Sequence, residues 1–343
     1  MELLLIQSQE HETLPMAELK AVIEAEEFDC SIEKLRPGLV ILSSIRNDDF
    51  DYMYKRLVER LALTHQINNV LLKSDLNSLD EDIASINWDD IINETFAVRT
   101  KTFNSDVNVE ACERHIGSII LNNSNNIKVN LSNPGTKVRL IIYKNDVYIC
   151  KEDYVLNKKY FQDFKPHKRP FFHPGCMSPK LARCMVNLSR IKKGELLLDP
   201  FCGTGGSLME GGLIGARVVG TDVDWNMKNG AAINCEYLGI KDYKTFKVDI
   251  NELNMYELCD AVVTDPHYGI STTTGGRDDL IFRDFLVAIK RNMKKDALLV
   301  MASPHFVDID KYLNEVGFKL LERYEIKVHR SLTRIISVIA QDN

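Results

Sequence analysis

The chain has 343 residues, of which 45% are hydrophobic and 27% charged, and its formal net charge is −6. This length and composition support the cores of two domains or of three small ones, and nothing in the sequence resembles a signal peptide or a membrane span of about 18 apolar residues. The eight cysteines form no Cys-x-x-Cys pair and the histidines have no ligand-spaced partners. These patterns argue against a metal site or a disulfide framework, and they favour the reducing cytoplasm.

Strand and helix patterns alternate over the first 75 residues. We predict strands at residues 3–7, 39–45 and 70–73, and helices at residues 14–26 and 50–63. This alternation is typical of a small ferredoxin-like domain.

A second α+β pattern follows, up to residue 150. It comprises strands at 96–99 and 127–131, a helix at 107–121, and a hairpin of strands at 138–143 and 146–150. The next stretch, residues 151–174, is rich in Lys, Pro and aromatic residues and has no Gly or Ser. We therefore predict an ordered linker there.

From residue 178 onward the pattern is that of a doubly wound α/β domain. Predicted strands lie at residues 195–199, 216–222, 245–249, 261–265, 297–302, 320–327 and 332–340. Predicted helices lie at residues 179–190, 225–238, 280–293 and 306–316, and another follows the glycine-rich loop and ends at residue 213. Parallel strands with helical crossovers and a final strand pair predict a class I, Rossmann-like methyltransferase sheet.

Positive charge is concentrated in the middle of the chain. Residues 151–200 carry 11 Lys and Arg against 5 Asp and Glu, whereas residues 1–100 carry 9 against 20. A local basic patch is what phosphate binding requires, and the net charge of the whole chain matters less. The charge alone is equally compatible with a solvated linker.

A glycine-rich loop, DPFCGTGG at residues 199–206, joins the first strand of the α/β pattern to its helix. Its glycines allow close backbone approach, and the helix N-terminus beyond them offers unpaired N–H groups. The spacing differs from the Gly-x-Gly-x-x-Gly of dinucleotide-binding folds, and Asp199 suits the cationic amino group of S-adenosylmethionine. The alternative is a tight turn without a ligand.

Two more acids follow the next two predicted strands. Asp222 ends the second strand and can accept hydrogen bonds from ribose hydroxyls, while Asp224 is better explained as the N-cap of the following helix. Asp249 ends the third strand and can accept a hydrogen bond from the adenine amino group. Ligands bind at the carboxyl ends of strands in such sheets. We therefore predict cofactor contacts from Asp199, Phe201, Gly203, Gly205, Asp222, Val223, Asp249 and Ile250.

The fourth predicted strand ends in the turn DPHY, residues 265–268. The exocyclic amine of a base is a weak nucleophile. The Asp265 carboxylate and the Pro266 carbonyl could accept its two N–H groups and align its lone pair with a methyl sulfonium. Tyr268 could stack on the base. Alone, the turn has an ordinary structural explanation. After three acids at the same sheet edge, it predicts catalytic Asp265, Pro266 and Tyr268.

These motifs resemble those of the archaeal tRNA (guanine-10-N2) methyltransferases. The resemblance is carried by residues 168–206, beginning KRPFFHPG, and by the DPHYG turn, and it covers most of residues 165–340. The N-terminal half resembles a THUMP domain, through FAVR at residues 96–99, Ile116-Gly117 and VNLSNP at residues 129–134. The resemblance implies an α/β methyltransferase domain preceded by an α+β RNA-binding domain, with S-adenosylmethionine as cofactor and tRNA as substrate.

The resemblance also adds residues to the site. His173 and Ser178 match the family segment that helps enclose the methionine end of the cofactor, and Asp265 and Tyr268 match the catalytic acid and the stacking residue. One departure is His267, which stands where the family usually has a second proline. It leaves the carboxylate and the ring in place but loosens the backbone between them.

We predict four segments: a ferredoxin-like domain (1–75), a THUMP domain (76–152), a basic linker (153–177) and the methyltransferase domain (178–343). The predicted reaction is mono- or dimethylation of guanosine N2 at tRNA position 10. Two alternatives stay open: a DNA adenine-N6 methyltransferase and a catalytically weakened tRNA-binding scaffold. The resemblance is compatible with a small activator protein as a partner, and without one we expect a monomer. We expect no association with a membrane.

Overall fold

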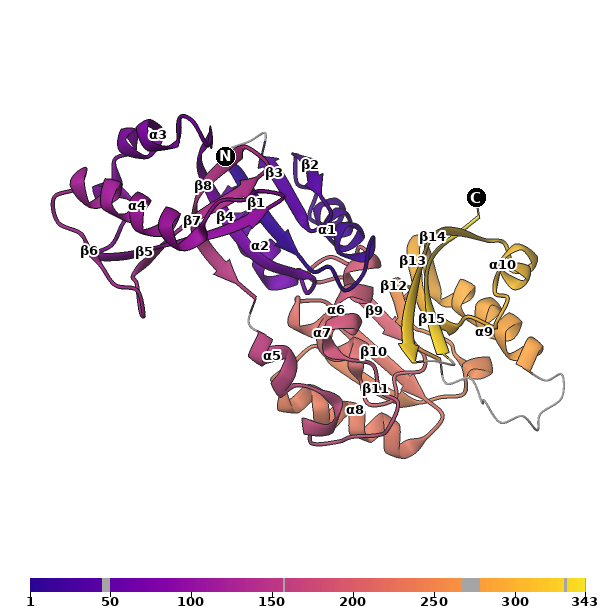
Figure 1. Ribbon diagram of the computed structural model, residues 1–343. Coiled ribbons are helices and arrows are strands. Elements are labelled where there is room, and N and C mark those ends of the chain that lie inside the picture. The colour runs from indigo at the N-terminus through magenta and orange to yellow at the C-terminus, as the bar shows by residue number, and fades with distance from the viewer. Residues whose placement is uncertain (45–49, 157, 267–277, 330–331, 343) are drawn as a thin grey trace. The chain divides into compact units, whose positions relative to one another are not determined.

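The computed structural model describes residues 1–44, 50–156, 158–266, 278–329 and 332–342 (Figure 1). The chain forms two compact units. The first comprises residues 1–9, 29–52 and 64–156, and the second comprises residues 10–28, 53–63 and 157–343. Helix α1 therefore belongs to the second unit, although the strands on either side of it belong to the first. The four predicted segment boundaries remain predictions.

The first unit is built on a mixed sheet with the strand order β2-β3-β1-β4-β8-β7-β5-β6. Its strands are β1 (Glu2–Gln7), β2 (Cys30–Arg36), β3 (Leu39–Ser44), β4 (Thr64–Asp75), β5 (Thr95–Phe103), β6 (Lys128–Val129), β7 (Thr136–Tyr143) and β8 (Asp146–Val155). The hairpin predicted about Lys144-Asn145 is present, since β7 and β8 pair antiparallel from Tyr143 and Asp146. Strand β5 runs parallel to β7.

Each face of this sheet has its own apolar cluster. On one face, β5 and β7 pack against α3 (Leu79–Ser85), the short helix η2 (Trp88–Asp90) and α4 (Val109–Asn122), with Trp88 and Ile116 fully buried. On the other face, Leu4, Ile41 and Ile141 share a cluster. This two-sided burial follows from the period of two in a strand, which directs neighbouring side chains to opposite faces.

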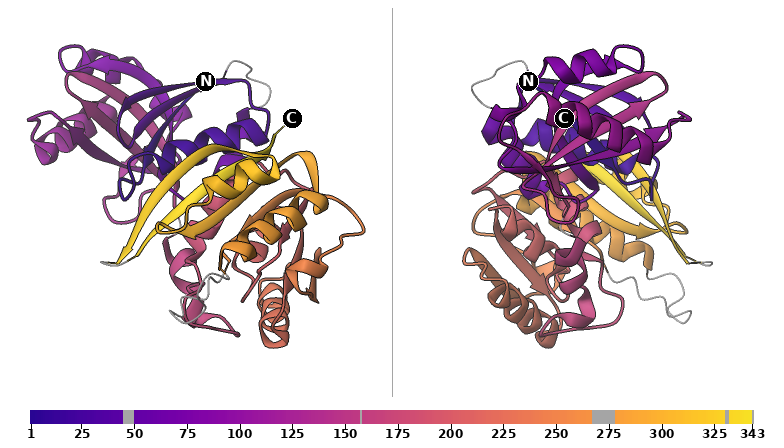
Figure 2. Two further views of the ribbon diagram at one scale, coloured as in Figure 1. Left: turned by 90° about the vertical axis from the view of Figure 1, so that its right-hand side faces the viewer. Right: turned by 60° about the vertical axis from the view of Figure 1, so that its left-hand side comes forward.

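The second unit is built on a sheet with the order β11-β10-β9-β12-β13-β15-β14. Its strands are β9 (Leu196–Asp199), β10 (Arg217–Asp222), β11 (Tyr243–Lys247), β12 (Cys259–Thr264), β13 (Met293–Pro304), β14 (Phe318–His329) and β15 (Leu332–Gln341). Strands β9 to β13 are parallel to their neighbours, whereas β15 is antiparallel to β13 and to β14. Figure 2 shows β14 and β15 as the long yellow pair. The predicted doubly wound α/β class is confirmed.

Helices cover both faces of this second sheet. They are α1 (Leu14–Ala25), α2 (Phe50–Arg60), α5 (Lys158–Asp163), η3 (Pro166–Lys168), α6 (Pro179–Leu188), α7 (Gly206–Leu213), α8 (Trp225–Tyr237), η4 (Ile250–Glu252), α9 (Asp278–Asn292) and α10 (Asp310–Val316). Residues of α1, α6, α7 and α8 share one core with Leu197 of β9. Residues of α9 and α10 share the other core with Leu196 and Leu198.

Helix α1 is joined to α6 through a buried carboxylate. Glu18 is fully buried and accepts hydrogen bonds from the backbone N–H groups of Ala62 (3.0 Å) and Leu63 (2.8 Å) and from Asn187 Nδ2 (2.9 Å). Arg60 Nε donates in turn to Asn187 Oδ1 at 3.1 Å. Buried polar groups of this kind specify one arrangement because each unmade bond is costly. These residues therefore fix residues 10–28 and 53–63 on the sheet of the second unit.

Several predicted boundaries differ from the structure. The third strand of the α/β unit ends at Lys247, so Asp249 does not end it. Strand β2 and helix α3 were not predicted, because β2 has a mostly polar sequence and α3 has only seven residues. Among the described residues, no helix is long and apolar enough to span a membrane.

Candidate functional site

The candidate site lies at the carboxyl ends of the parallel strands of the second unit. A small cavity of about 50 Å³ brings Asp199, Phe201, Gly203 and Asp265 together with residues 175–177. These parts of the chain are up to 90 residues apart in sequence, and they meet because β9 and β12 pair in parallel and end at the same edge. The enclosed space is far smaller than S-adenosylmethionine, so most of a bound cofactor must lie outside it.

The glycine loop has a left-handed backbone at two of its three glycines, while Gly206 begins helix α7. Gly203 and Gly205 have φ values of 49° and 81°, in the left-handed region that favours glycine. A Cβ on Gly205 would also lie 3.1 Å from the Cα and Cβ atoms of Ala231 in α8. The loop therefore requires glycine here both for its conformation and for its close packing.

Asp199 is buried at the end of β9. It accepts hydrogen bonds from Thr264 Oγ1 at 2.8 Å and from the Phe201 N–H at 3.2 Å. Burial raises the pKa of Asp199 to about 7; hydrogen bonds from Thr264, Phe201 and Ser207 oppose this shift, and the charge of Asp265 adds to it. A buried carboxyl of raised pKa is suited to bind a cation, because a cation compensates the cost of its ionisation.

Asp222 supports the glycine loop from the end of β10. Its Oδ2 accepts a hydrogen bond from the Gly203 N–H at 3.0 Å, and its Oδ1 accepts one from the Asp224 N–H at 2.9 Å. Asp224 itself is the N-cap of α8 and accepts from the Asn226 N–H at 2.7 Å, as the sequence predicted. The neighbouring Val223 is 61% exposed, which leaves its side chain accessible at this edge.

Other predicted cofactor residues have structural partners. Asp249 is the N-cap of η4 and accepts from the Asn251 N–H at 2.9 Å, and Ile250 packs against an apolar core. Ser178 is the N-cap of α6 and accepts from the Leu181 N–H at 3.3 Å. His173 Nδ1 donates to the Pro174 carbonyl at 2.9 Å. Their contacts with a cofactor remain predictions.

The segment before α6 is attached to the glycine loop by residues that the sequence analysis missed. Cys176 Sγ lies 2.8 Å from the His173 carbonyl and 3.0 Å from Thr204 Oγ1. The buried Asn234 of α8 bonds to both backbone groups of Phe171 and donates to the Thr204 carbonyl at 2.9 Å. No local pattern reveals the contacts of Cys176 with Thr204 and of Asn234 with Phe171 and Thr204, because they join segments 28 to 63 residues apart.

Asp265 follows β12 and has a partner that was also missed. Its Oδ2 lies 3.1 Å from Arg334 Nη2, which comes from the antiparallel strand β15. Pro266 is buried. The predicted stacking residue Tyr268, together with His267 and Gly269, lies outside the described residues. The described part of the site thus combines the carboxyl groups of Asp199, Asp222 and Asp265 with a glycine loop and the Arg334 cation.

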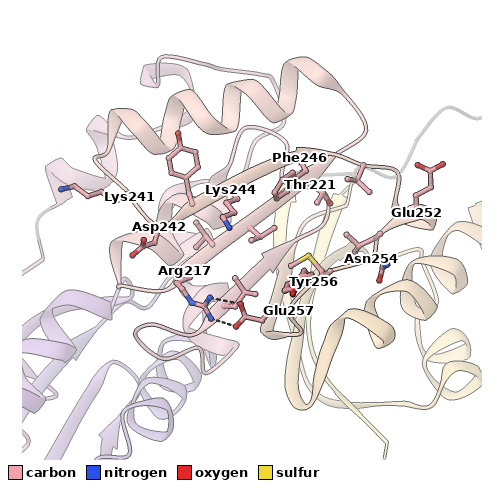
Figure 3. Close-up of a pocket in the computed structure, with 17 residues that line it drawn as sticks. Arg217, Thr221, Lys241, Asp242, Lys244, Phe246, Glu252, Asn254, Tyr256 and Glu257 are labelled. Carbon is pink, nitrogen blue, oxygen red and sulfur yellow. Dashed lines mark hydrogen bonds and ion pairs between the residues drawn. The ribbon is translucent and has the colours of Figure 1, made fainter.

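A larger cavity, of about 600 Å³, lies elsewhere in this unit (Figure 3). It is lined by β10, β11 and the segment 252–257. Arg217 forms a bidentate ion pair with Glu257 in its wall, in which Nη1 donates to Oε2 at 2.9 Å and Nη2 donates to Oε1 at 2.7 Å. None of the predicted catalytic or cofactor residues lines it. Size alone therefore does not locate the chemistry, and the strand-end site remains the candidate.

Comparisons with known proteins agree with this arrangement. A family model for the RMKL-like methyltransferase domain matches residues 166–336, and a THUMP domain model matches residues 73–152. The chain is 41% identical over 340 residues to a tRNA (guanine(10)-N2)-dimethyltransferase of Methanothermobacter thermautotrophicus, covering 99% of each protein. It is 36% identical to the enzyme of that name from Methanocaldococcus jannaschii, covering 96% of this chain and 97% of the relative.

Solved structures support the fold. The crystal structure of TrmN from Thermus thermophilus matches with a TM-score of 0.59 at 16% identity, covering 99% of this chain and 100% of the other. At that identity the likeness concerns the fold alone. The predicted combination of a THUMP domain and a methyltransferase domain is confirmed.

Proposed function

The chain belongs to the family of the archaeal tRNA (guanine(10)-N2)-dimethyltransferases, and we propose that it transfers methyl groups from S-adenosylmethionine to N2 of guanosine 10 in tRNA. It is an S-adenosylmethionine-dependent methyltransferase. The observation that carries the proposed reaction is the meeting of Asp265, Asp199 and the glycine loop at one strand-end cavity. The relatives are named dimethyltransferases, so we propose that a second methyl group follows the first.

The residues at the strand ends fit the cofactor. S-adenosylmethionine supplies a methyl group that its sulfonium makes electrophilic. We propose that Asp199 binds its cationic amino group, that the backbone of Gly203 and Gly205 allows its close approach, and that Asp222 binds its ribose hydroxyls. The raised pKa of the buried Asp199 supports the first contact, since the carboxyl gains most from a cationic partner. We propose that Val223, Asp249 and Ile250 contact the cofactor on the side of its adenine.

Asp265 and Pro266 act on the guanine amine in this proposal. The Asp265 carboxylate and the Pro266 carbonyl each accept one N–H of the exocyclic amine, so that its lone pair points at the methyl carbon. The nitrogen forms the new N–C bond, the electrons of the broken C–S bond pass to sulfur, and the nitrogen then loses a proton to solvent. Positioning of this kind contributes much of the rate enhancement in reactions between two bound groups. Tyr268, outside the described residues, is proposed to stack on the base.

We propose that the first unit holds the tRNA. It contains the THUMP match, and a groove of about 430 Å³ lies between β5, β6 and α4, with Arg99 and Arg114 among its lining residues. Leu131 in this groove is 66% exposed. Exposed apolar groups suit unpaired nucleotides, whose bases stack on them. The arginines pair with Glu113 and Glu110 of the same groove and would exchange these partners for phosphates when tRNA binds. The basic segment 151–200 would add salt-dependent phosphate contacts.

For the assembly, we propose a cytoplasmic protein that binds a small activator protein and is otherwise monomeric. All eight cysteines are free thiols, which agrees with a reducing compartment. Light scattering of the purified chain is expected to give a mass near 39.2 kDa, and a dimer mass would contradict this part of the proposal. Affinity purification from the native cell tests for the activator.

Mass spectrometry of nucleosides tests the reaction. Purified protein is incubated with S-adenosylmethionine and an unmodified tRNA transcript, and the digested nucleosides are expected to contain N2-methylguanosine and N2,N2-dimethylguanosine. A transcript with adenosine at position 10 is the substrate control. Asp265→Ala should abolish transfer and leave calorimetric cofactor affinity within about twofold, because Asp265 holds the amine and not the cofactor. Two results would contradict the proposal. One is methylation of the adenosine-10 transcript as fast as that of the unmodified transcript, and the other is an Asp265→Ala variant that keeps a tenth or more of the wild-type turnover.

A further inference from the structure

Arg334 reaches the candidate active site from a strand that carries no predicted site residue. Strand β15 is antiparallel to its neighbours, so its first residues lie at the edge where the parallel strands end. Arg334 stands opposite Pro304 of β13 and Ile326 of β14. Its Nη2 is 3.1 Å from Asp265 Oδ2, and the two side chains are 19% and 26% exposed.

This ion pair differs from the one that Arg323 forms on the neighbouring strand. Arg323 of β14 pairs with Asp310, and both side chains are substantially exposed, at 38% and 48%. Such surface pairs contribute little to stability because solvent screens them. The Arg334 pair is more shielded, and its carboxylate lines the cavity that also holds Asp199 and Gly203. A shielded arginine fixes the orientation of a carboxylate and favours its ionised form.

Asp199 is a second carboxyl group at this edge, and its closeness to Asp265 gives the Arg334 cation an electrostatic role. Asp199 ends β9 and Asp265 directly follows the neighbouring strand β12, and the charge of Asp265 disfavours ionisation of Asp199. The repulsion is mutual, so Asp265 also bears a cost for its charge. Arg334 is the cation that the described residues bring into an ion pair with Asp265, and it offsets this cost.

We propose that Arg334 is a positioning residue for methyl transfer, which holds Asp265 ionised and in one orientation toward the guanine amine. This assignment rests on the proposed function. A carboxylate paired with arginine is a weak base but remains a good hydrogen-bond acceptor. Asp265 is therefore suited to align the amine, while the proton released from nitrogen passes to solvent.

Full-length variants test this assignment with synthetic tRNA. Arg334→Met removes the cation and keeps a long side chain on the strand, Arg334→Lys retains a cation, and Arg323→Met is the matched control that breaks an exposed pair on the neighbouring strand. We expect Arg334→Met to lower kcat by on the order of 100-fold, the loss that a displacement of about 1 Å can cause. The acid limb of its kcat–pH profile should move to higher pH. Arg334→Lys should recover part of kcat and return the acid limb of the kcat–pH profile to its wild-type position. Arg323→Met should have the wild-type kcat and pH profile.

Two other measurements separate positioning from other roles. The calorimetric Kd for S-adenosylmethionine and the KM for tRNA should stay within about twofold of wild type in Arg334→Met. Unchanged kcat and acid limb would overturn the assignment, as would a higher KM for tRNA with unchanged kcat, which would indicate a phosphate contact. A wild-type protein that methylates no tRNA overturns the proposed function, and the assignment with it. Wild-type activity that persists fully in Arg334→Met overturns the assignment alone.

Discussion

Asp199→Asn is expected to remove a pH dependence of cofactor binding that the wild-type protein shows. Burial raises the pKa of Asp199 to about 7, so this carboxyl is about half protonated at neutral pH before the cofactor binds. Binding of the cationic amino group requires the ionised form. The wild-type affinity for S-adenosylmethionine should therefore rise with pH and be accompanied by release of a proton.

The size of the effect follows from the pKa. With a value of about 7, roughly one-tenth of the carboxyls are ionised at pH 6 and roughly nine-tenths at pH 8, so Kd should fall about tenfold, or ~1.4 kcal/mol, over this interval. An asparagine cannot ionise. Asp199→Asn should bind the cofactor more weakly than wild type at pH 8 and with little pH dependence, because a neutral amide lacks the charge-assisted hydrogen bond.

Titration calorimetry in two buffers of different ionisation enthalpy measures both quantities. Asp224→Asn is the matched control, since Asp224 lies at the same sheet edge as an N-cap and asparagine caps equally well. Its pH profile should match wild type. A wild-type Kd that does not change between pH 6 and 8, or a profile that persists in Asp199→Asn, would refute the assignment of Asp199 to the cofactor amino group.

Thermal stability gives an independent check of the same pKa. The folded-state pKa of Asp199 lies above the ordinary 3.8, so the folded protein holds this proton more tightly than the unfolded chain does. The stabilisation from this proton is complete at low pH and is lost as pH rises through about 7. Asp199→Asn should therefore raise Tm relative to wild type more at pH 8 than at pH 5.

Three further substitutions test the surroundings of the site. Asp222→Ala should weaken S-adenosylmethionine binding by about tenfold or more, from the loss of hydrogen bonds worth about 1.5–3 kcal/mol, and an unchanged calorimetric Kd would place the ribose contact elsewhere. Gly230→Ala should lower Tm and speed hydrogen exchange at residues 165–178, because the new Cβ would lie 1.9 Å from Phe171 Cδ1; in Gly117→Ala, the helical control, the nearest atom is 4.0 Å away. Glu18→Ala should cost about 2–6 kcal/mol in the free energy of unfolding by leaving two buried N–H groups unpaired, and a Tm within about 1 °C of wild type would contradict this.

The sequence by itself determined the α/β unit and identified residues that the structure brings together at its strand ends. Strands β9, β10 and β12 contain short apolar segments, LLL, VV and AVV, and end in or beside Asp199, Asp222 and Asp265. The positive φ angles of Gly203 and Gly205 between β9 and α7 are local requirements of the backbone. Such features depend on neighbours in the chain, so pattern and turn chemistry reveal them. The N-cap role of Asp224 was likewise predicted correctly, because a cap is decided within three residues.

Only the tertiary structure decided which distant residues act together. Arg334 comes to Asp265 through the antiparallel register of β15, Asn234 reaches the glycine loop across 30 residues, and Glu18 finds its partners 44 to 169 residues away. Pairing with distant strands also decides that the polar segment β2 forms an edge strand, and that β11 ends before Asp249, which caps η4 instead. A local sequence pattern does not contain this information. Strand order and register are set by burial summed over the whole sheet. A short window of sequence records which side chains prefer burial, but it does not record which other segments will bury them.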